Sequence, residues 1–598
     1  MVNPRVLKKE QKLGEAVPMA LPMLRQVGPA MATVAACVVA TYLVPQLEFA
    51  RPWTPGEPVP FWNLIGRPFE AEAIAAEEER AEEVEEVAQE VLAQKDPEPV
   101  VDPPREVVAA ETVKTLPAYV AREGDDKRAT QALELLEGNE LDGFFEQLAR
   151  TDASIEGAMV RVIHWGDSAI GIDGIPGAIR RRMQNRFGDG GHGFHLMAPP
   201  NTSYRHREVD FDHNDNWKKC FIIHKCRSDG FYGLGGTTFS SWGGGESSFA
   251  PHPERSSGKV SRFELYYAGQ PEGGHLRLQV DDGEKIIVET AADQLEDRWH
   301  AIDVPDGPHE LSVRAVGEGQ VRLFGVTMER PGPGIVWDSA ALVGAFTNRM
   351  NELDQDHLAA QMQHRGIDLV VFTFGGNDMI RKVKMSTYAD EYRAVIDRVK
   401  KAKPEAACLV MAPLDHGERQ GAEIVSRAVV PRMVQAQREA AESRGCAFFD
   451  TFAAMGGKGS AGRWYNRKPR LMSGDLGHAT LKGHQVIGEL FYRALLEAYV
   501  AYRARADVEG IPAEVPTRAV PTKTALPSGD AAPTPPTVDG TQAQPAAPPS
   551  APADVPSEPD PPADPPPTEA PTERALPSVN DPVGDDMPEN SDDSPTSG

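Results

Sequence analysis

Short, almost wholly apolar runs, each followed by an amphipathic stretch, mark two regions of this chain and limit the folds open to it. Residues 367–374 and 407–411 are nearly continuous in apolar side chains, which is typical of strands buried on both faces of a parallel sheet. Apolar residues between them return at helical spacing across 388–399. The same strand-then-helix order recurs at 159–165 and 175–187, and at 447–449 and 481–499. The pattern predicts an α/β fold with helices on both faces of a parallel sheet.

The stretch between these two regions, residues 200–335, follows a different pattern. Apolar and polar side chains alternate with a period of two, and turns such as Asp282-Gly283 separate the runs. The alternating runs are residues 262–267, 276–280, 311–316 and 321–324. The alternation predicts a jelly-roll-like all-β sandwich, inserted so that it divides the α/β domain into 118–199 and 336–502.

The N-terminal segment predicts that the folded body lies outside the cytoplasm. Residues 1–25 are basic, and residues 26–47 carry no charge. A helix over those 22 residues is roughly 33 Å long, enough to cross a bilayer. The basic residues precede it, which predicts a cytoplasmic N-terminus and an anchor in the inner membrane. A cleaved signal peptide and a lipoprotein signal at Cys37 are the alternatives, and both also place the body outside.

Two acidic, proline-bearing segments flank the predicted body. Residues 48–117 contain a Glu- and Ala-rich part, 69–95, whose thin apolar stripe predicts a solvated helix or short coiled coil. The prolines from residue 96 onward predict a spacer. Residues 503–598 hold no aromatic side chain and no cysteine, so they cannot bury enough apolar surface to fold, and a disordered tail is predicted.

Charge and cysteine content narrow the classes of function and partner. The chain has 62 basic and 89 acidic residues, a net charge of −27, which argues against a nucleic-acid partner. Five cysteines in 598 residues do not make a disulfide framework. Cys408 is expected as a free thiol in a buried strand. Cys220 and Cys226 flank a strand-like run that spans roughly 20 Å when extended, so they can pair only if the run bends back. A straight strand holds these two cysteines and His224 too far apart to bind one tetrahedral ion, so no metal or other cofactor is expected.

A serine follows the first predicted strand, and an asparagine follows a later one. Ligands of open α/β sheets bind outside the carboxyl ends of the strands, where residues 166–168 (Gly-Asp-Ser) and 375–378 (Gly-Gly-Asn-Asp) both fall. Ser168 is the candidate nucleophile. The Asn377 amide is a candidate hydrogen-bond donor to an oxyanion.

A carboxylate and an imidazole stand three residues apart just before the last predicted helix. Asp475 and His478 can both be supplied by one short loop, in which the carboxylate fixes the tautomer of the imidazole and stabilises its charged form. Each motif alone also suits an ordinary turn or helix entry. Together, and in this order, they satisfy the requirement for a nucleophile, a base, an orienting acid and oxyanion donors.

These motifs resemble the conserved blocks of the SGNH (GDSL-type) hydrolases, which have a flavodoxin-like three-layer fold. Residues 166–168, 375–378 and 475–478 resemble blocks one, three and five, and Gly344 is the best candidate for the block-two glycine. The resemblance implies that Ser168 attacks an ester carbonyl, with His478 as general base and Asp475 orienting it. It also implies an oxyanion hole from the backbone N–H groups of Ser168 and Gly344 and the Asn377 side chain.

The match is similar in more detail to bacterial peptidoglycan O-acetylesterases. Residues 180–194 resemble the helix and glycine loop after the nucleophile, and the predicted β insert occupies the position of a carbohydrate-binding-like module. The subgroup often has His after the nucleophile, where Ala169 stands here. The resemblance implies an esterase of the bacterial cell envelope acting on an acetylated glycan, with peptidoglycan as the first expectation. A polysaccharide O-acetyltransferase with the same triad, or a glycan-binding protein with an idle catalytic domain, are the alternatives. The sequence does not indicate an oligomeric state.

Several further side chains are weaker candidates. His164 and His484 are expected to pack structurally, and His416, soon after the strand at 407–411, is a candidate to face substrate. Aromatic residues of the insert, Trp242, Tyr266 and Tyr267, are candidates to stack on sugar rings, although such residues are usually part of a core.

Overall fold

The computed structural model describes residues 33–34, 40, 67–94 and 106–516. The chain divides into two units, Met1–Thr524 and Ala525–Gly598, and the second lies wholly outside the described residues. The basic N-terminus predicted at 1–25, nearly all of the anchor predicted at 26–47 and the tail from 517 onward also lie outside them. Within the described part of the chain, no helix is long and apolar enough to cross a membrane.

A five-stranded parallel sheet forms the centre of the α/β part, with strand order β13-β1-β14-β15-β18. Its strands are β1 (Met159–Gly166), β13 (Gly334–Ala341), β14 (Leu369–Thr373), β15 (Ala407–Met411) and β18 (Ala447–Phe449). Every residue of β13, β14, β15 and β18 is buried, which explains the near-continuous apolar runs in the sequence.

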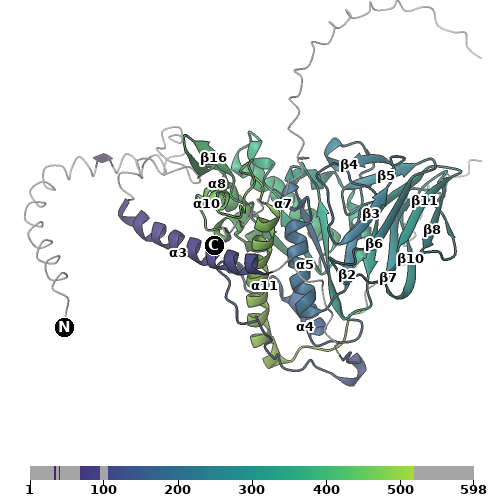
Figure 1. The fold of residues 1–598 in the computed structure, drawn as a ribbon, viewed down its shortest axis with the longest axis horizontal. Helices are drawn as coiled ribbons and strands as arrows, with labels where there is room; N and C mark the ends of the chain where they lie inside the picture. Colours follow the sequence, from purple (N-terminus) through teal and green to yellow (C-terminus); the bar gives the residue numbers. More distant parts are fainter. Residues whose placement is uncertain (1–32, 35–39, 41–66, 95–105, 517–598) are drawn as a thin grey trace, which may run out of the picture. The chain divides into compact units, whose positions relative to one another are not determined.

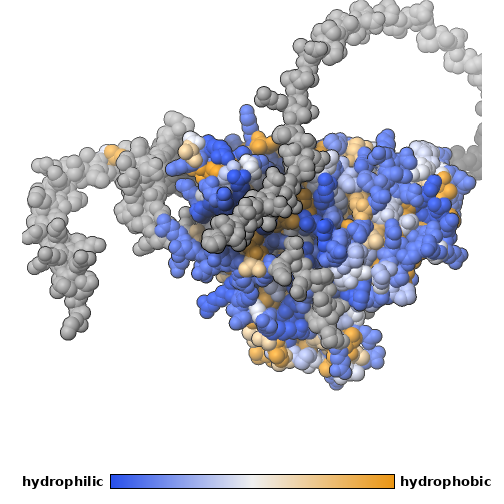
Figure 2. Space-filling model, in the orientation of Figure 1, coloured by the Kyte–Doolittle hydropathy of each residue, from blue (hydrophilic) through white to orange (hydrophobic). Residues whose placement is uncertain are grey.

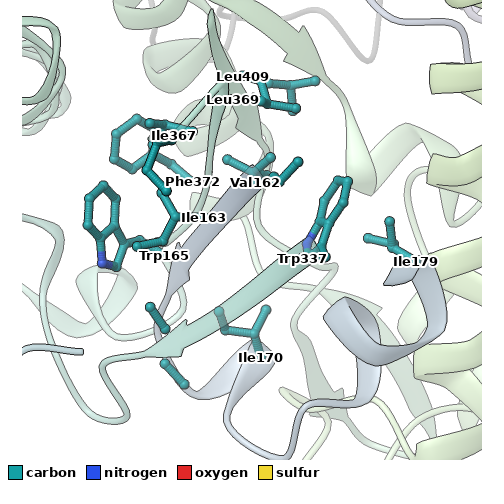
Figure 3. Packing of buried hydrophobic residues seen from close by; sticks show 14 of the residues in the cluster. Val162, Ile163, Trp165, Ile170, Ile179, Trp337, Ile367, Leu369, Phe372 and Leu409 are labelled. Atoms are coloured by element: carbon teal, nitrogen blue, oxygen red, sulfur yellow. The ribbon is translucent and has the colours of Figure 1, made fainter. Parts of the chain in front are cut away.

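Helices cover both faces of this sheet, as the strand-helix alternation predicts (Figure 1). They are α4 (Asp142–Asp152), α5 (Gly174–Phe187), α6 (Gln355–Arg365), α7 (Met385–Ala402), α8 (Val429–Glu442) and α11 (Leu481–Glu509). Phe491 of α11 contacts Trp337 and Phe449 on one face. Tyr392 of α7 contacts Phe372, which stacks on Trp165, on the other. Figure 3 shows Trp337 and Trp165 on opposite sides of the strands. The α/β part therefore has three layers, helices, parallel sheet and helices, as the sequence predicts.

Two antiparallel sheets occupy the chain between α5 and β13. One has the order β10-β7-β12-β5-β4, with β2 also on β12, and the other has the order β3-β6-β11-β8-β9. Their strands are β2 (Gly191–His195), β3 (Val209–His213), β4 (Lys218–Phe221), β5 (Thr237–Ser241), β6 (Glu246–Pro251), β7 (Val260–Gly269), β8 (His275–Val280), β9 (Ile286–Glu289), β10 (Glu296–Gly307), β11 (Leu311–Gly317) and β12 (Val321–Glu329). Figure 2 shows a largely hydrophilic surface over β3, β8 and β11, as expected where alternate side chains face solvent.

The predicted boundaries of this β region differ from the structure at both ends. β2 was predicted within 118–199 as part of the α/β domain, but it pairs with β12 of the antiparallel sheet. Gly334 and Ile335 were predicted within 200–335, but they begin β13 of the parallel sheet, opposite Met159 and Val160. The backbone hydrogen bonds between strands decide which sheet each segment joins. The glycine-rich sequence around β2 has no alternation of apolar and polar side chains from which its sheet could be predicted.

The segments on either side of the body pack more than the sequence predicts. α3 (Arg67–Ala93) was expected to be solvated, but Val84, Val87, Ala88 and Val91 are buried. Its Glu85 and Glu90 pair with Arg467 and with Arg493 of α11. A thin apolar stripe on a helix becomes buried when it packs into a narrow groove on the body. Residues distant in the sequence form that groove, so the sequence of the helix does not predict it.

The boundary between the body and the predicted tail is also corrected. The tail was predicted to begin at residue 503, but α11 continues to Glu509, held by the Arg503–Asp507 ion pair. Ile511 is buried, and its carbonyl accepts a hydrogen bond from Leu116 N–H at 2.8 Å. Residues 106–117, predicted as the end of a spacer, are therefore docked on the body.

Two disulfides correct the expectation for Cys408 and decide the one left open for Cys220 and Cys226. Cys408 is bonded to Cys446 and is not a free thiol. It lies in β15 one residue before the Leu409–Ala447 pairing, so its neighbour on the adjacent strand register is Cys446. Cys220 is bonded to Cys226 because a 3₁₀ turn, Ile222–His224, folds the run back and brings their Cα atoms to 5.9 Å. Both thiols are thereby used, so they are not metal ligands.

Candidate active site

The carboxyl-terminal edge of the parallel sheet holds the predicted nucleophile. β1 ends at Gly166, and Asp167 N–H donates to the Thr373 carbonyl at the end of β14 (3.1 Å). A Cβ atom at Gly166 would lie 2.6 Å from that carbonyl oxygen, so only glycine lets the two strand ends approach. Asp167 then caps a short 3₁₀ turn that starts with Ser168, accepting a hydrogen bond from Ala169 N–H (2.9 Å). The turn directs the chain away from the sheet at the serine.

Ser168, His478 and Asp475 form a continuous hydrogen-bonded row. Ser168 Oγ lies 2.8 Å from His478 Nε2, and His478 Nδ1 lies 2.7 Å from Asp475 Oδ2. The serine and the imidazole are 310 positions apart in the sequence. Since the carboxylate accepts at Nδ1, the proton of a neutral imidazole resides there, and Nε2 offers its lone pair to the serine hydroxyl. This is the geometry required of a nucleophile, a general base and its orienting acid.

The loop that carries the acid and the base is shaped by its own backbone. Asp475 Oδ1 accepts from the N–H groups of Gly477 (3.0 Å) and His478 (3.1 Å), while Leu476 takes a left-handed conformation with φ of 60°. Ser473 N–H donates to the His478 carbonyl (2.8 Å), and Thr480 caps α11. One carboxylate therefore holds both the loop and the imidazole ring.

Charge in the triad favours an ionised acid beside the base. The hydrogen bond to His478 holds the pKa of Asp475 well below its usual range. The same bond raises the pKa of His478, because the carboxylate stabilises the imidazolium. The two side chains remain 54% and 46% exposed, so water and substrate reach them directly.

A second carboxyl group lies behind the nucleophile. Asp167 is buried, and desolvation raises its pKa to about 6, with the nearby Asp378 carboxylate adding to the shift. Asp378 accepts from the Thr347 N–H (2.9 Å) and hydroxyl (2.8 Å) and from Arg381 (3.1 Å). Asp167 also contributes to the raised pKa of His478. The base is thus flanked by negative charge on two sides.

The predicted oxyanion donors lie around the same strand ends. Asn377 lines the pocket in front of Ser168, and its side-chain amide donates to the Ala345 carbonyl (3.1 Å), which leaves a second N–H for a ligand. Gly344, with φ of +84°, precedes Ala345 but is not among the pocket-lining residues. Within the described part of the chain, the backbone N–H groups of Ser168 and Gly344 have no acceptor.

The pocket around the triad is small and open. Its volume is about 190 Å³, and Ala169, Phe374, Pro413, Leu414, His416 and Arg427 complete its lining with the residues above. His416, a weak candidate from the sequence, is brought to the site. Arg427 was missed, because nothing in its local sequence distinguishes it from other surface arginines.

Other sequence candidates lie away from the reacting groups. His164 is fully buried between Thr373 (2.7 Å) and Trp337 (3.3 Å), and burial lowers its pKa to about 3. His484 is also buried, with a pKa lowered to about 3. Both are structural, as expected. Among the residues described, no group of three or more His, Cys, Asp or Glu side chains is arranged to hold a metal.

Comparison with known proteins gives a family match and a fold match. Residues 316–486 match the GDSL-like Lipase/Acylhydrolase family. The match includes Asn377, Asp475 and His478 but not Ser168, which joins the site because β1 lies between β13 and β14. No curated protein matches the chain.

Solved structures that resemble the chain include two esterases. A peptidoglycan O-acetylesterase aligns with a TM-score of 0.51 and 20% identity, covering 60% of this chain and 96% of its own. A carbohydrate esterase family 2 enzyme with a carbohydrate-binding domain, from Corynascus thermopiles (Myceliophthora fergusii), aligns with a TM-score of 0.23 and 13% identity, covering 49% of this chain and 100% of its own.

Proposed function

We propose that this chain, whose residues 316–486 match the GDSL-like Lipase/Acylhydrolase family, is an esterase that removes O-acetyl groups from a cell-envelope polysaccharide by way of an acetyl-enzyme. The observation that carries the proposal is the 2.8 Å contact between Ser168 Oγ and His478 Nε2, with Asp475 on the far side of the ring. A hydroxyl so placed loses its proton to the imidazole as it attacks a carbonyl carbon.

The proposed reaction has two halves that use the same groups. In the first, Ser168 Oγ bonds to the acetyl carbon, His478 takes the hydroxyl proton, and the carbonyl electron pair moves onto its oxygen. Collapse of this intermediate breaks the bond to the sugar oxygen, which leaves with the proton from His478. In the second, His478 removes a proton from water, which attacks the acetyl-serine, and acetate leaves as Ser168 regains its proton.

Oxyanion stabilisation is assigned to three donors. They are the backbone N–H groups of Ser168 and Gly344 and the free N–H of the Asn377 amide. The unpartnered state of both backbone groups supports their role, and the Asn377–Ala345 hydrogen bond ties the loop with Gly344 to the asparagine. One such donor is worth about 10²–10³ in rate.

The substrate class is proposed from the size of the site and from similarity. The open pocket of about 190 Å³ around the triad has room for an acetyl ester carried on a sugar. The likeness in fold to a peptidoglycan O-acetylesterase makes acetylated peptidoglycan the first substrate to test. We further propose that the antiparallel sheets of residues 209–329 are a carbohydrate-binding-like insert. Trp242 is 69% exposed there, whereas Tyr266 and Tyr267 are buried and unavailable for stacking.

An extracytoplasmic location is supported by the two disulfides, since such bonds persist mainly outside the reducing cytoplasm. The membrane anchor at residues 26–47 remains a prediction from the sequence alone.

The test compares the wild type with Ser168→Ala in release of acetate from O-acetylated peptidoglycan. We expect a loss of at least about 10³-fold in the variant, because no other group can form the acetyl-enzyme. Equal rates would remove the proposal. Adding an unacetylated glycan acceptor separates hydrolysis from transfer: an acetyltransferase would acetylate the acceptor at the expense of free acetate.

A further inference from the structure

A small hairpin forms one wall of the candidate active site. It consists of β16 (Gly417–Gln420) and β17 (Glu423–Ser426), and the residues at its two ends, His416 and Arg427, line the pocket. Arg427 N–H donates to the His416 carbonyl (2.8 Å), which closes the base of the hairpin. Gly417 N–H donates to the carbonyl of Leu476 (2.7 Å), between Asp475 and His478. Arg427 is therefore held at a fixed place relative to the catalytic loop.

The charge of Arg427 has no counter-ion in the described part of the protein. No carboxylate there lies within ion-pair distance of its guanidinium. The two carboxylates nearest the nucleophile do not pair with Arg427, because Asp475 is bonded to His478 and Asp167 is buried behind the serine. Some arginines elsewhere in the body are paired with carboxylates, such as Arg381 with Glu391 and Arg438 with Glu134. Others, such as Arg419 and Arg470, stack on an aromatic ring, that of Tyr465. An unpaired guanidinium in a pocket wall is suited to a planar anion from the ligand.

The start of α8 adds to the positive potential at this wall. The helix begins at Val429, two residues after Arg427, and its N-cap residue, Ala428, has no side chain that can cap it. α8 follows β15, so its N-terminus lies at the carboxyl edge of the sheet, where the active site is. Val430 N–H already donates to the Arg427 carbonyl (3.0 Å), and Pro431 has no N–H, so the contribution of this helix is its dipole, whose positive end favours an anion.

His416 supplies a neutral acceptor beside the arginine. Its Nδ1 lies 3.0 Å from the Leu414 carbonyl, which fixes the proton there and leaves Nε2 with a lone pair. Burial lowers the pKa of His416, so the ring stays uncharged at neutral pH. The wall thus offers a cation for a carboxylate and an acceptor for a hydroxyl, a combination that suits an acidic sugar.

We propose that Arg427 binds a carboxylate on the sugar that carries the acetyl ester, so that the enzyme prefers acidic acetylated glycans over neutral ones. The inference rests on the proposed esterase function and narrows its substrate class. A charge-assisted hydrogen bond to a carboxylate is worth enough to change kcat/KM by about 10- to 100-fold.

The experiment uses two sugars that differ only in charge. Tri-O-acetylated methyl glucuronoside carries the carboxylate, and its primary carboxamide is the neutral counterpart; 4-nitrophenyl acetate reports the triad alone. For the wild type we expect kcat/KM about 10- to 100-fold higher for the acid than for the amide. Arg427→Gln should remove this preference by lowering kcat/KM for the acid to that for the amide, and Arg427→Lys should restore part of it. The ratio of the rates on acid and amide is the readout, and the rate on 4-nitrophenyl acetate reports any change in the triad itself.

Arg419→Gln is the matched control, because Arg419 belongs to the same hairpin but stacks on Tyr465 and does not line the pocket. It should keep the wild-type preference. Equal wild-type rates on acid and amide, or an Arg427→Gln variant that retains the preference, would overturn the proposal. A wild-type enzyme with no activity on any of the three esters would instead overturn the esterase function itself. Thermal melting of each variant shows whether a loss comes from unfolding.

Discussion

His478 lies between two carboxyl groups, one in direct contact and one buried behind the nucleophile. Asp475 and Asp167 both raise its pKa, so a larger share of the imidazole is protonated near pH 7 than in a free histidine. Only the neutral ring can accept the serine proton. Activity therefore rises as pH increases through the pKa of His478. This rising limb of the pH–rate profile lies above the ordinary histidine pKa of about 6.5.

Asp475→Asn should change both the maximal rate and the pH range over which activity rises. The maximal rate should fall by about 10⁴, because an amide no longer selects the productive tautomer. The limb should also move to lower pH, because the carboxylate that raises the pKa of His478 is gone. Profiles of kcat/KM against pH measure both effects, with Asp215→Asn, an exposed residue outside the pocket, as the control. An unshifted limb would show that the carboxylate does not set this pKa.

At the scale of elements, the Cys408–Cys446 disulfide ties β15 to the residue before β18. It closes a span of 38 positions, whereas Cys220–Cys226 closes six. A longer closed span restricts the unfolded chain more strongly. We expect Cys408→Ala/Cys446→Ala to lower stability by about 2–4 kcal/mol, and more than Cys220→Ala/Cys226→Ala does. Chemical denaturation of both double variants is the measurement, and a larger loss in the six-residue pair would contradict the expectation.

The elements differ in how far the sequence predicts them. β15 and β18 have the predicted bounds, because a strand buried on both faces is apolar throughout. Their disulfide was missed because pairing depends on the register between strands, which no local pattern encodes. α3 was predicted as a helix, but its docking depends on a groove formed by distant residues. Of the site, Ser168 and Asn377 were predicted from polar residues at strand ends, and Asp475 and His478 from a loop before the last helix. Arg427 reaches the pocket only through the β16–β17 hairpin.

At the scale of the whole molecule, buried imidazoles make the fold sensitive to acid. Burial lowers the pKa values of eight histidines below the ordinary 6.5: His164, His192, His195, His206, His213, His300, His416 and His484. Their unfolded forms bind protons as pH falls below about 6.5, while the folded forms do not, so stability is lost below that value. Asp167, Asp368 and Asp378 oppose this, because burial raises their pKa values and the folded state takes up their protons first.

The histidines outnumber the carboxyls, so we expect the melting temperature to fall by several degrees between pH 7.5 and pH 5. Calorimetric scans at constant ionic strength measure it. A melting temperature that rises on acidification would show that the three buried carboxyls dominate.

The half-exposed side chains of Asp475 and His478 have a consequence for how a polymer is handled. A catalytic triad that is open to solvent along its length does not require a glycan chain to enter the site by its end. A long chain can lie across the mouth anywhere, so acetyl groups in its interior are as accessible as those at its tips. The glycan chain should then keep its length while its acetyl groups are removed.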